Sequence, residues 1–137
     1  MSIAENIKHY QSQMPAQTEL IAVSKTKPIE DLQQAYDAGQ RLFGENKALE
    51  MRDKYEALPK DILWHFIGHL QTNKVKYIVP FVAMIHSVDS LKLLCEINKE
   101  AKKCGRVVDC LLQVDIAHEE TKFGMDDEQI EQLLISE

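Results

Sequence analysis

Cysteine and glycine are scarce in this sequence, and the motifs that depend on them are missing. Its 137 residues include three cysteines and five glycines. Cys95, Cys104 and Cys110 are odd in number and lack the C-x-x-C spacing of zinc or redox sites, so we expect reduced thiols, as in cytoplasmic proteins. The G-x-G-x-x-G fingerprint and the G-x-x-x-x-G-K-[ST] loop are also absent, which argues against a function based on NAD or a nucleoside triphosphate.

Long hydrophobic runs and an excess of positive charge are missing as well. No apolar run approaches the length of a membrane-spanning helix, so we expect no membrane partner. The N-terminal segment MSIAENIKHY is polar and has no apolar core of a signal peptide, which favours a cytoplasmic location. The formal net charge of -6 makes a broad nucleic-acid-binding surface improbable.

The sequence instead alternates short apolar runs with amphipathic stretches. Hydrophobic residues make up 45% of the chain and charged residues 28%, which is ordinary for a globular domain with its own core. A capping pattern at Ser2 and Glu5 predicts an opening helix that stops near Pro15. Strands are then predicted at 20–25, 41–44, 63–67, 84–87 and 107–116, with helices at 29–39, 46–58, 70–79, 90–104 and from 126 onward. The last of these strands is almost continuously apolar, so we expect it to be buried on both faces.

This regular alternation predicts an α/β fold with a parallel sheet. Two architectures fit it equally well: an open doubly wound sheet, or about five βα units of an eight-unit barrel behind an N-terminal helix. Both place ligands at the carboxyl ends of the strands.

Lys25 stands where the first predicted strand ends and the next helix is about to begin. Pro28 suits the first turn of that helix, where a missing N–H costs nothing. An amine at an apolar strand end suits a Schiff-base lysine. The alternative is an ordinary lysine that points into water, which is the commoner case.

Polar side chains follow the other predicted strands too. Asn46 and Ser90 also fit the structural alternative of helix caps, but five strand ends with polar groups predict one shared site on one rim. Those groups are Lys25, Glu45, Asn46, His65, His69, His86, Ser87, Asp89, Gln113 and Asp115.

Five motifs, read in order, resemble the pyridoxal-phosphate homeostasis protein family, which shares the barrel of the alanine racemase N-terminal domain. They are A-V-S-K-T-K-P at 22–28, F-G-E-N at 43–46, W-H-F-I-G-H-L-Q-T-N-K at 64–74, S-V-D-S at 87–90 and Q-V-D-I-A-H-E-E-T-K-F-G at 113–124. The resemblance implies a TIM-type (β/α)8 barrel that holds pyridoxal 5′-phosphate (PLP) as a Schiff base. It also implies a role in vitamin B6 and amino-acid homeostasis without catalytic turnover.

The resemblance assigns the cofactor lysine to Lys25 and places Asn46, His65 and Ile67 beside the cofactor. Lys27 lies past the strand and is expected to be a surface residue. Asp115 stands where many relatives have asparagine, and its role is open.

The family's phosphate-binding segments have no match in this sequence. We therefore expect residues 1–137 to form an incomplete barrel domain that is the N-terminal portion of a family member and holds PLP weakly, if at all. An incomplete barrel has open strand edges, so self-association is expected.

Two other functions stay open. One is a PLP-dependent amino-acid racemase, which needs a second acid–base group, a tyrosine. The four tyrosines of this chain all fall in predicted helices, away from the rim. The other is a cofactor-free fragment that acts by association.

Overall fold

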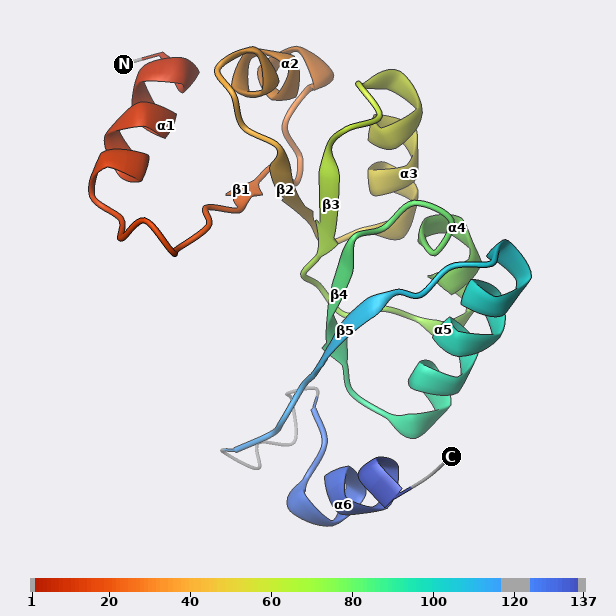
Figure 1. The fold of residues 1–137 in the computed structure, drawn as a ribbon. Helices are drawn as coiled ribbons and strands as arrows, with labels where there is room; N and C mark the ends of the chain where they lie inside the picture. Colours follow the sequence, from red (N-terminus) through yellow and green to blue (C-terminus); the bar gives the residue numbers. More distant parts are fainter. Residues whose placement is uncertain (1, 117–123, 136–137) are drawn as a thin grey trace.

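The computed structural model describes residues 2–116 and 124–135 and contains a five-stranded parallel sheet. The strand order is β1-β2-β3-β4-β5, so every strand pairs with its neighbour in the sequence (Figure 1). The strands are β1 (Ala22–Val23), β2 (Leu42–Glu45), β3 (Leu63–Phe66), β4 (Met84–Val88) and β5 (Asp109–Leu112). The helices are α1 (Ile3–Ser12), α2 (Ile29–Asp37), α3 (Ala48–Ala57), α4 (Val75–Ile78), α5 (Leu91–Cys104) and α6 (Asp127–Ile135), with a 3-10 turn η1 at Thr72–Lys74.

Local capping groups fix the ends of several helices. Ser2 Oγ accepts the N–H of Glu5 at 3.1 Å, and Ser90 Oγ accepts the N–H of Leu93 at 3.1 Å. At α6, Asp126 and Gln129 bond to each other's backbone N–H groups, as their spacing predicts. Gly105 ends α5 in the left-handed conformation, with φ at 65°.

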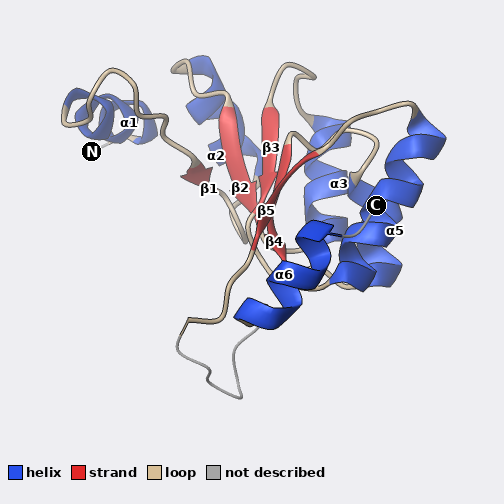
Figure 2. Ribbon diagram, turned by 60° about the horizontal axis from the view of Figure 1, so that its bottom comes forward, coloured by secondary structure: helices blue, strands red, loops and turns tan. Residues whose placement is uncertain are grey.

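Helices α2 to α5 cover one face of the sheet, and the core lies between them and the strands (Figures 1 and 2). Strand alternation points every second side chain into this layer. The sheet contributes Phe43, Trp64, Phe66 and Ile85, and the helices contribute Leu32, Met51, Val75, Ile78, Leu93 and Ile97, all of them buried.

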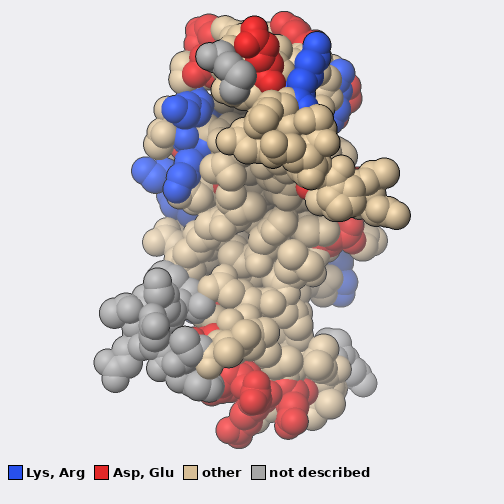
Figure 3. All heavy atoms as spheres, turned by 90° about the vertical axis from the view of Figure 1, so that its left-hand side faces the viewer, with Lys and Arg blue, Asp and Glu red and all other residues tan. Residues whose placement is uncertain are grey.

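The opposite face of the sheet is open and carries few charged side chains along its middle (Figure 3). Val23, Leu63 and Leu111 lie on β1, β3 and β5 and are 55%, 49% and 47% exposed. Parallel sheets are normally covered on both faces, so this face is the inner side of a barrel that the described residues do not close. The α/β fold and the parallel sheet predicted from the sequence are confirmed, and the incomplete barrel fits them.

Two of the predicted strands are longer than the strands in the structure. The first strand is only Ala22–Val23, because the chain turns at Thr26, whose φ is 62°. The fifth is Asp109–Leu112, and its surroundings are not buried on both faces: Val107 is 93% exposed and Ile116 is 83% exposed. Cys104 lies exposed at the end of α5.

A buried glutamine replaces part of the short β1 ladder. Gln40 is 2% exposed, and its Nε2 donates to Leu20 O at 2.6 Å and to Leu42 O at 2.7 Å. One side-chain amide thus joins the segment before β1 to β2 where backbone pairing has not begun. This satisfies carbonyl groups that would otherwise be costly to bury.

Beyond β5 the chain gains one further backbone contact. Val114 and Met125 form an isolated parallel bridge, with Met125 N donating to Gln113 O at 2.8 Å. The expectation that the fifth strand has no partner on its outer side is therefore wrong at its carboxyl end. Residues 117–123 of the last family-like motif lie outside the described residues. No helix in the described part of the chain is long and apolar enough to cross a bilayer.

The open face generates a prediction about association. We expect the 137-residue chain to self-associate, because Val23, Leu63 and Leu111 would gain apolar contacts. Leu111→Lys should raise the dissociation constant at least about tenfold, which corresponds to roughly 1.4 kcal/mol, near the low end for burying one leucine. Sedimentation velocity over a concentration series measures this.

Leu134→Lys is the matched control, since Leu134 is exposed on α6 and lies outside the sheet. A monodisperse monomer at all concentrations would refute the prediction, and equal effects of the two substitutions would show that the open face is not the contact.

Candidate functional site

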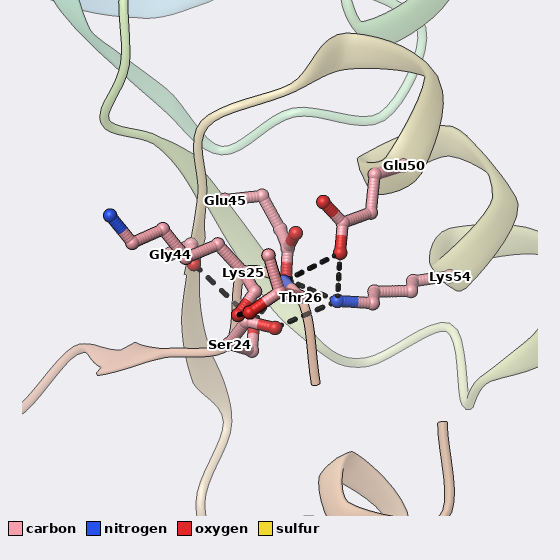
Figure 4. Close-up of polar contacts among 7 residues, drawn as sticks. All are labelled: Ser24, Lys25, Thr26, Gly44, Glu45, Glu50 and Lys54. Atoms are coloured by element: carbon pink, nitrogen blue, oxygen red, sulfur yellow. Dashed lines mark hydrogen bonds and ion pairs between the residues drawn. The ribbon is translucent and has the colours of Figure 1, made fainter. Parts of the chain in front are cut away.

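Lys25 is the first exposed residue after β1. Ser24 before it is buried and faces the helices, so alternation turns Lys25 to the same side as Val23. In Figure 4 its amine points away from the cluster formed by the side chains behind it. This exposure matches the alternative of an ordinary lysine that points into water. Lys27 is also exposed and lies beyond the turn at Thr26, as expected.

Strand register brings three of the four predicted site residues into one row. Val23 is paired with Gly44, and Gly44 with His65. The ladder continues one step further, because Ser24 N donates to Gly44 O at 2.9 Å and Ile67 N donates to Glu45 O at 2.8 Å. The next inward positions on the first three strands are therefore Lys25, Asn46 and Ile67. His65 lies one row deeper.

Two glycines let the strands and loops approach at this place. A Cβ on Gly44 would lie 2.9 Å from Ile67 Cδ1 and 3.1 Å from Ile21 Cγ2. A Cβ on Gly68 would lie 2.5 Å from Asn46 Cβ and 2.9 Å from its backbone oxygen. The glycines thus allow Ile67 to lie over Gly44 and hold Asn46 against the turn after β3.

Asn46 does not cap α3, which corrects the structural alternative considered above. The N-cap residue is Lys47, and it makes no side-chain capping bond. Asn46 is half-buried at the end of β2 and close against Gly68. The Asn46 side chain therefore belongs to the row of Lys25 and Ile67, and not to the start of α3.

His65 pairs with a histidine that was not among the predicted cofactor contacts. His65 Nδ1 lies 2.8 Å from His86 Nε2 of β4, and the rings meet edge to face. Burial lowers the pKa of both imidazoles, the nearby His86 lowers that of His65 further, and Glu19 opposes this. In a neutral pair one ring donates its N–H to the other. The polar residues at the end of the fourth predicted strand were the only signal for this contact.

A buried cluster of charged groups lies behind Lys25, on the helical side of the sheet (Figure 4). Lys54 Nζ of α3 lies 2.9 Å from Glu45 Oε2 and 2.8 Å from Glu50 Oε2. Burial raises the pKa of Glu45, against the hydrogen bonds from Ser24 and Lys54. Burial also acts on Glu50, but hydrogen bonds from Lys54 and the Thr26 N–H outweigh it and lower its pKa.

Sequence reasoning missed this cluster. The spacing of Glu50 and Lys54 is typical of a helical ion pair, and alternation with Phe43 places Glu45 toward the helices. Those two signals together could have found it.

Other polar groups of the rim lie further away. His69 Nδ1 lies 3.1 Å from Asp89 Oδ2. A surface pocket of about 340 Å³ opens beside them, and Lys25 does not line it. Its walls include Asn46, Lys47, Leu49, His69, Gln71 and Lys74. Residues 2–116 and 124–135 contain no cluster of three or more His, Cys, Asp or Glu side chains suited to a metal ion.

The histidine pair predicts a pH dependence of stability. A histidine whose folded pKa lies below its unfolded value of 6.5 stabilises the fold fully above that pH, and the contribution is lost as the pH falls below it. The free energy of unfolding, measured by urea denaturation, should therefore fall from about pH 7.5 to about pH 5.5, near the usual histidine range. His86→Gln should flatten this fall.

Because carboxylates also titrate toward acid pH, the informative quantity is the difference between variant and unmodified chain. His9→Gln, on the exposed side of α1, serves as the control for the substitution itself. An unchanged slope in His86→Gln would contradict the assignment.

Comparisons with known proteins show the family of this chain. The family model described as "Alanine racemase, N-terminal domain" matches residues 1–136. The chain is 46% identical over 115 residues to a pyridoxal phosphate homeostasis protein of Aquifex aeolicus, covering 83% of this chain and 50% of that protein. It is 37% identical over 134 residues to the protein of the same name from Mus musculus, covering 90% of this chain and 48% of that protein. The chain thus spans about half the length of these curated relatives.

Solved structures share the fold. PipY of Synechococcus elongatus, solved without PLP, gives a TM-score of 0.88 at 38% identity, covering 96% of this chain and 64% of that one. Its structure with PLP bound gives 0.87 at 38% identity, with 97% and 62% covered. Alanine racemase from E. faecalis gives 0.73 at 18% identity, with 96% and 36% covered, which supports the fold alone. The chain therefore belongs to the family of the alanine racemase N-terminal domain, on the branch of the pyridoxal phosphate homeostasis proteins.

Proposed function

We propose that this chain binds PLP through a Schiff base on Lys25 and serves vitamin B6 and amino-acid homeostasis in the cytoplasm, without turnover of its own. The observation that carries the proposal is the row of Lys25, Asn46 and Ile67 at the carboxyl ends of three adjacent strands. The relatives named as homeostasis proteins and the PLP-bound PipY structure support it.

The described residues fit the aldehyde and ring of this cofactor. Lys25 supplies an exposed amine, and Ile67, whose side chain lies over Gly44, supplies an apolar wall. With PLP bound, the Lys25 amine would supply the nitrogen of the Schiff base, and the aldehyde oxygen would leave as water. Asn46 and His65 are the proposed polar neighbours of the ring.

The phosphate group needs further partners. Phosphates are usually held by backbone N–H groups at a helix start and by basic or hydroxyl side chains. The family's segments of that kind have no counterpart in this sequence, and the curated relatives are about twice as long as the part that matches. We therefore propose that Lys25 provides the covalent attachment and that affinity is low in this chain alone.

A racemase function is the second candidate, because the fold is that of the alanine racemase N-terminal domain. The tyrosines are Tyr10 in α1, Tyr36 in α2, Tyr55 in α3 and Tyr77 in α4. The Tyr36 hydroxyl donates to Asp61 Oδ1 at 2.5 Å, and the Tyr55 ring stacks on Phe81 with 4.0 Å between ring centroids. Both tyrosines lie on the helical side of the sheet. None of the four lies in a strand or strand-end loop near Lys25, so this chain offers no tyrosine as a second acid–base group. A cofactor-free role in association remains the third candidate.

The first prediction of this proposal concerns the site of attachment. With excess PLP, followed by borohydride reduction, the main adduct should form on Lys25, because its amine alone stands in the row with Asn46 and Ile67. Peptide mass mapping locates the adduct. Lys25→Ala should abolish it and change the free energy of unfolding by no more than about 0.5 kcal/mol, as expected for an exposed side chain.

Lys27→Ala is the matched control and should keep the adduct on Lys25. A dominant adduct on Lys27 or Lys74 in the unmodified chain would contradict the assignment of Lys25 as the Schiff-base lysine. Complete absence of a visible-range absorption band and of any trapped adduct would favour the cofactor-free alternative.

The second prediction concerns catalysis. We expect no substantial racemisation, decarboxylation or transamination of free amino acids in the presence of PLP, beyond what free PLP itself gives, because no acid–base tyrosine faces Lys25. Chiral chromatography of amino acids after long incubation checks this. Turnover that depends on Lys25 would establish the racemase-like alternative instead.

A further inference from the structure

The backbone on both sides of Lys25 is held by the buried cluster behind it. Lys54 is 5% exposed, and its Nζ donates to Ser24 O at 2.7 Å as well as to Glu45 and Glu50. On the other side of Lys25, Thr26 N donates to Glu50 Oε2 at 2.8 Å. Figure 4 shows these contacts meeting behind the Lys25 backbone while its side chain leaves in the other direction.

The side chain of Ser24 adds a second attachment. Its Oγ donates to Glu45 Oε2 and lies 3.3 Å from Gly44 O. Ser24 is therefore bound through its N–H, its carbonyl and its hydroxyl, each to a group on β2 or α3. Little freedom remains for the residue from which Lys25 departs.

Thr26 adopts a conformation that must be held from outside. Its φ of 62° is in the left-handed region, which is rare for a β-branched residue and costs on the order of 1 kcal/mol or more. Such strain persists where surrounding contacts impose it. The contact to Glu50 supplies this, and Thr26 Oγ1 donates to Lys25 O at 2.6 Å. The turn at Thr26 sends the chain away from the sheet and leaves Lys25 at the rim.

The stability of the fold alone does not explain why this buried cluster is made of charged residues. A buried ion pair costs about as much in lost hydration as it gains, and apolar residues of similar volume are often as good. Glu45 is fully buried, and its Oε1 has no hydrogen-bond partner among the described residues. Unlike apolar side chains, the charged groups form directional hydrogen bonds. These bonds fix two particular backbone groups, the carbonyl of Ser24 and the N–H of Thr26.

We propose that Lys54 is a positioning residue for Lys25. Together with Glu50 it fixes the backbone of residues 24–26, so that the Lys25 amine is presented in the row of Asn46 and Ile67. This inference rests on the proposed function for its chemical consequence, the addition of the amine to the PLP aldehyde with loss of water. Its structural part stands on the contacts alone. Lys54 itself is too buried to react.

Amide hydrogen exchange of the 137-residue chain tests the structural part without cofactor. In Lys54→Met, which keeps length and removes the charge, the Thr26 N–H should exchange about tenfold faster or more, as in local opening. Glu50→Leu should do the same, whereas Glu50→Gln keeps an acceptor for this N–H and should retain most of the protection. Lys99→Met, at an exposed position of α5, is the matched control and should match the unmodified chain.

The rate of adduct formation on Lys25 tests the chemical part. With excess PLP, the rate constant from borohydride trapping should fall about tenfold or more in Lys54→Met and in Glu50→Leu, since misplacing a reacting group costs this much. Lys54→Arg should recover part of the rate. Circular dichroism and a cooperative melt confirm that each variant folds; if Lys54→Met does not, the isosteric pair Glu50→Gln and Glu50→Leu decides.

The outcomes separate this inference from the proposed function. If the folded Lys54→Met variant keeps both the Thr26 protection and the Lys25 rate of the unmodified chain, Lys54 does not position Lys25, and the proposed function stands. If the unmodified chain forms no adduct on Lys25, the proposed function fails, and faster Thr26 exchange in Lys54→Met still supports the positioning of residues 24–26. Faster exchange without any change in rate overturns the chemical consequence.

Discussion

The contact between Lys54 and Glu45 joins a helix to the sheet where neither side chain meets water. A buried carboxylate without a cation would be very costly, so the position of α3 against β2 depends on this pair. The same ammonium group holds the carbonyl of Ser24 at the end of β1. The end of β1, β2 and α3 are thereby fixed to one another by a single side chain, and the candidate site lies in front of it.

The two faces of the sheet carry side chains with different roles. Trp64 and Phe66 point into the helical layer and stabilise the fold, whereas His65 between them points to the open face. On β2, Gly44 on the open face leaves room and Glu45 on the other face carries charge. Parallel strands in register bring such alternate residues into rows, so the chemistry of the rim follows from the pairing of strands.

The sequence predicted what depends on local patterns. Capping patterns at Ser2 and Ser90 gave helix starts, because these contacts involve residues close in the chain. Asn46 was misread as a possible cap, since the pattern does not say which of two adjacent residues starts α3. The contact of His65 with His86 depends on register between strands, which periodicity does not define. The burial of Glu45 escaped notice because charged residues are seldom buried.

The strand order has a consequence for how this fold is made. Because β1 to β5 pair only with their neighbours in the sequence, each strand can pair with one that was synthesised before it. The sheet grows in one direction during synthesis, and α3 with Lys54 arrives soon after β1 and β2. In a sheet that forms in this order, the rim around Lys25 would be among the first parts of the domain to take shape, and the outer edge of β1 has no partner strand within residues 2–116 and 124–135.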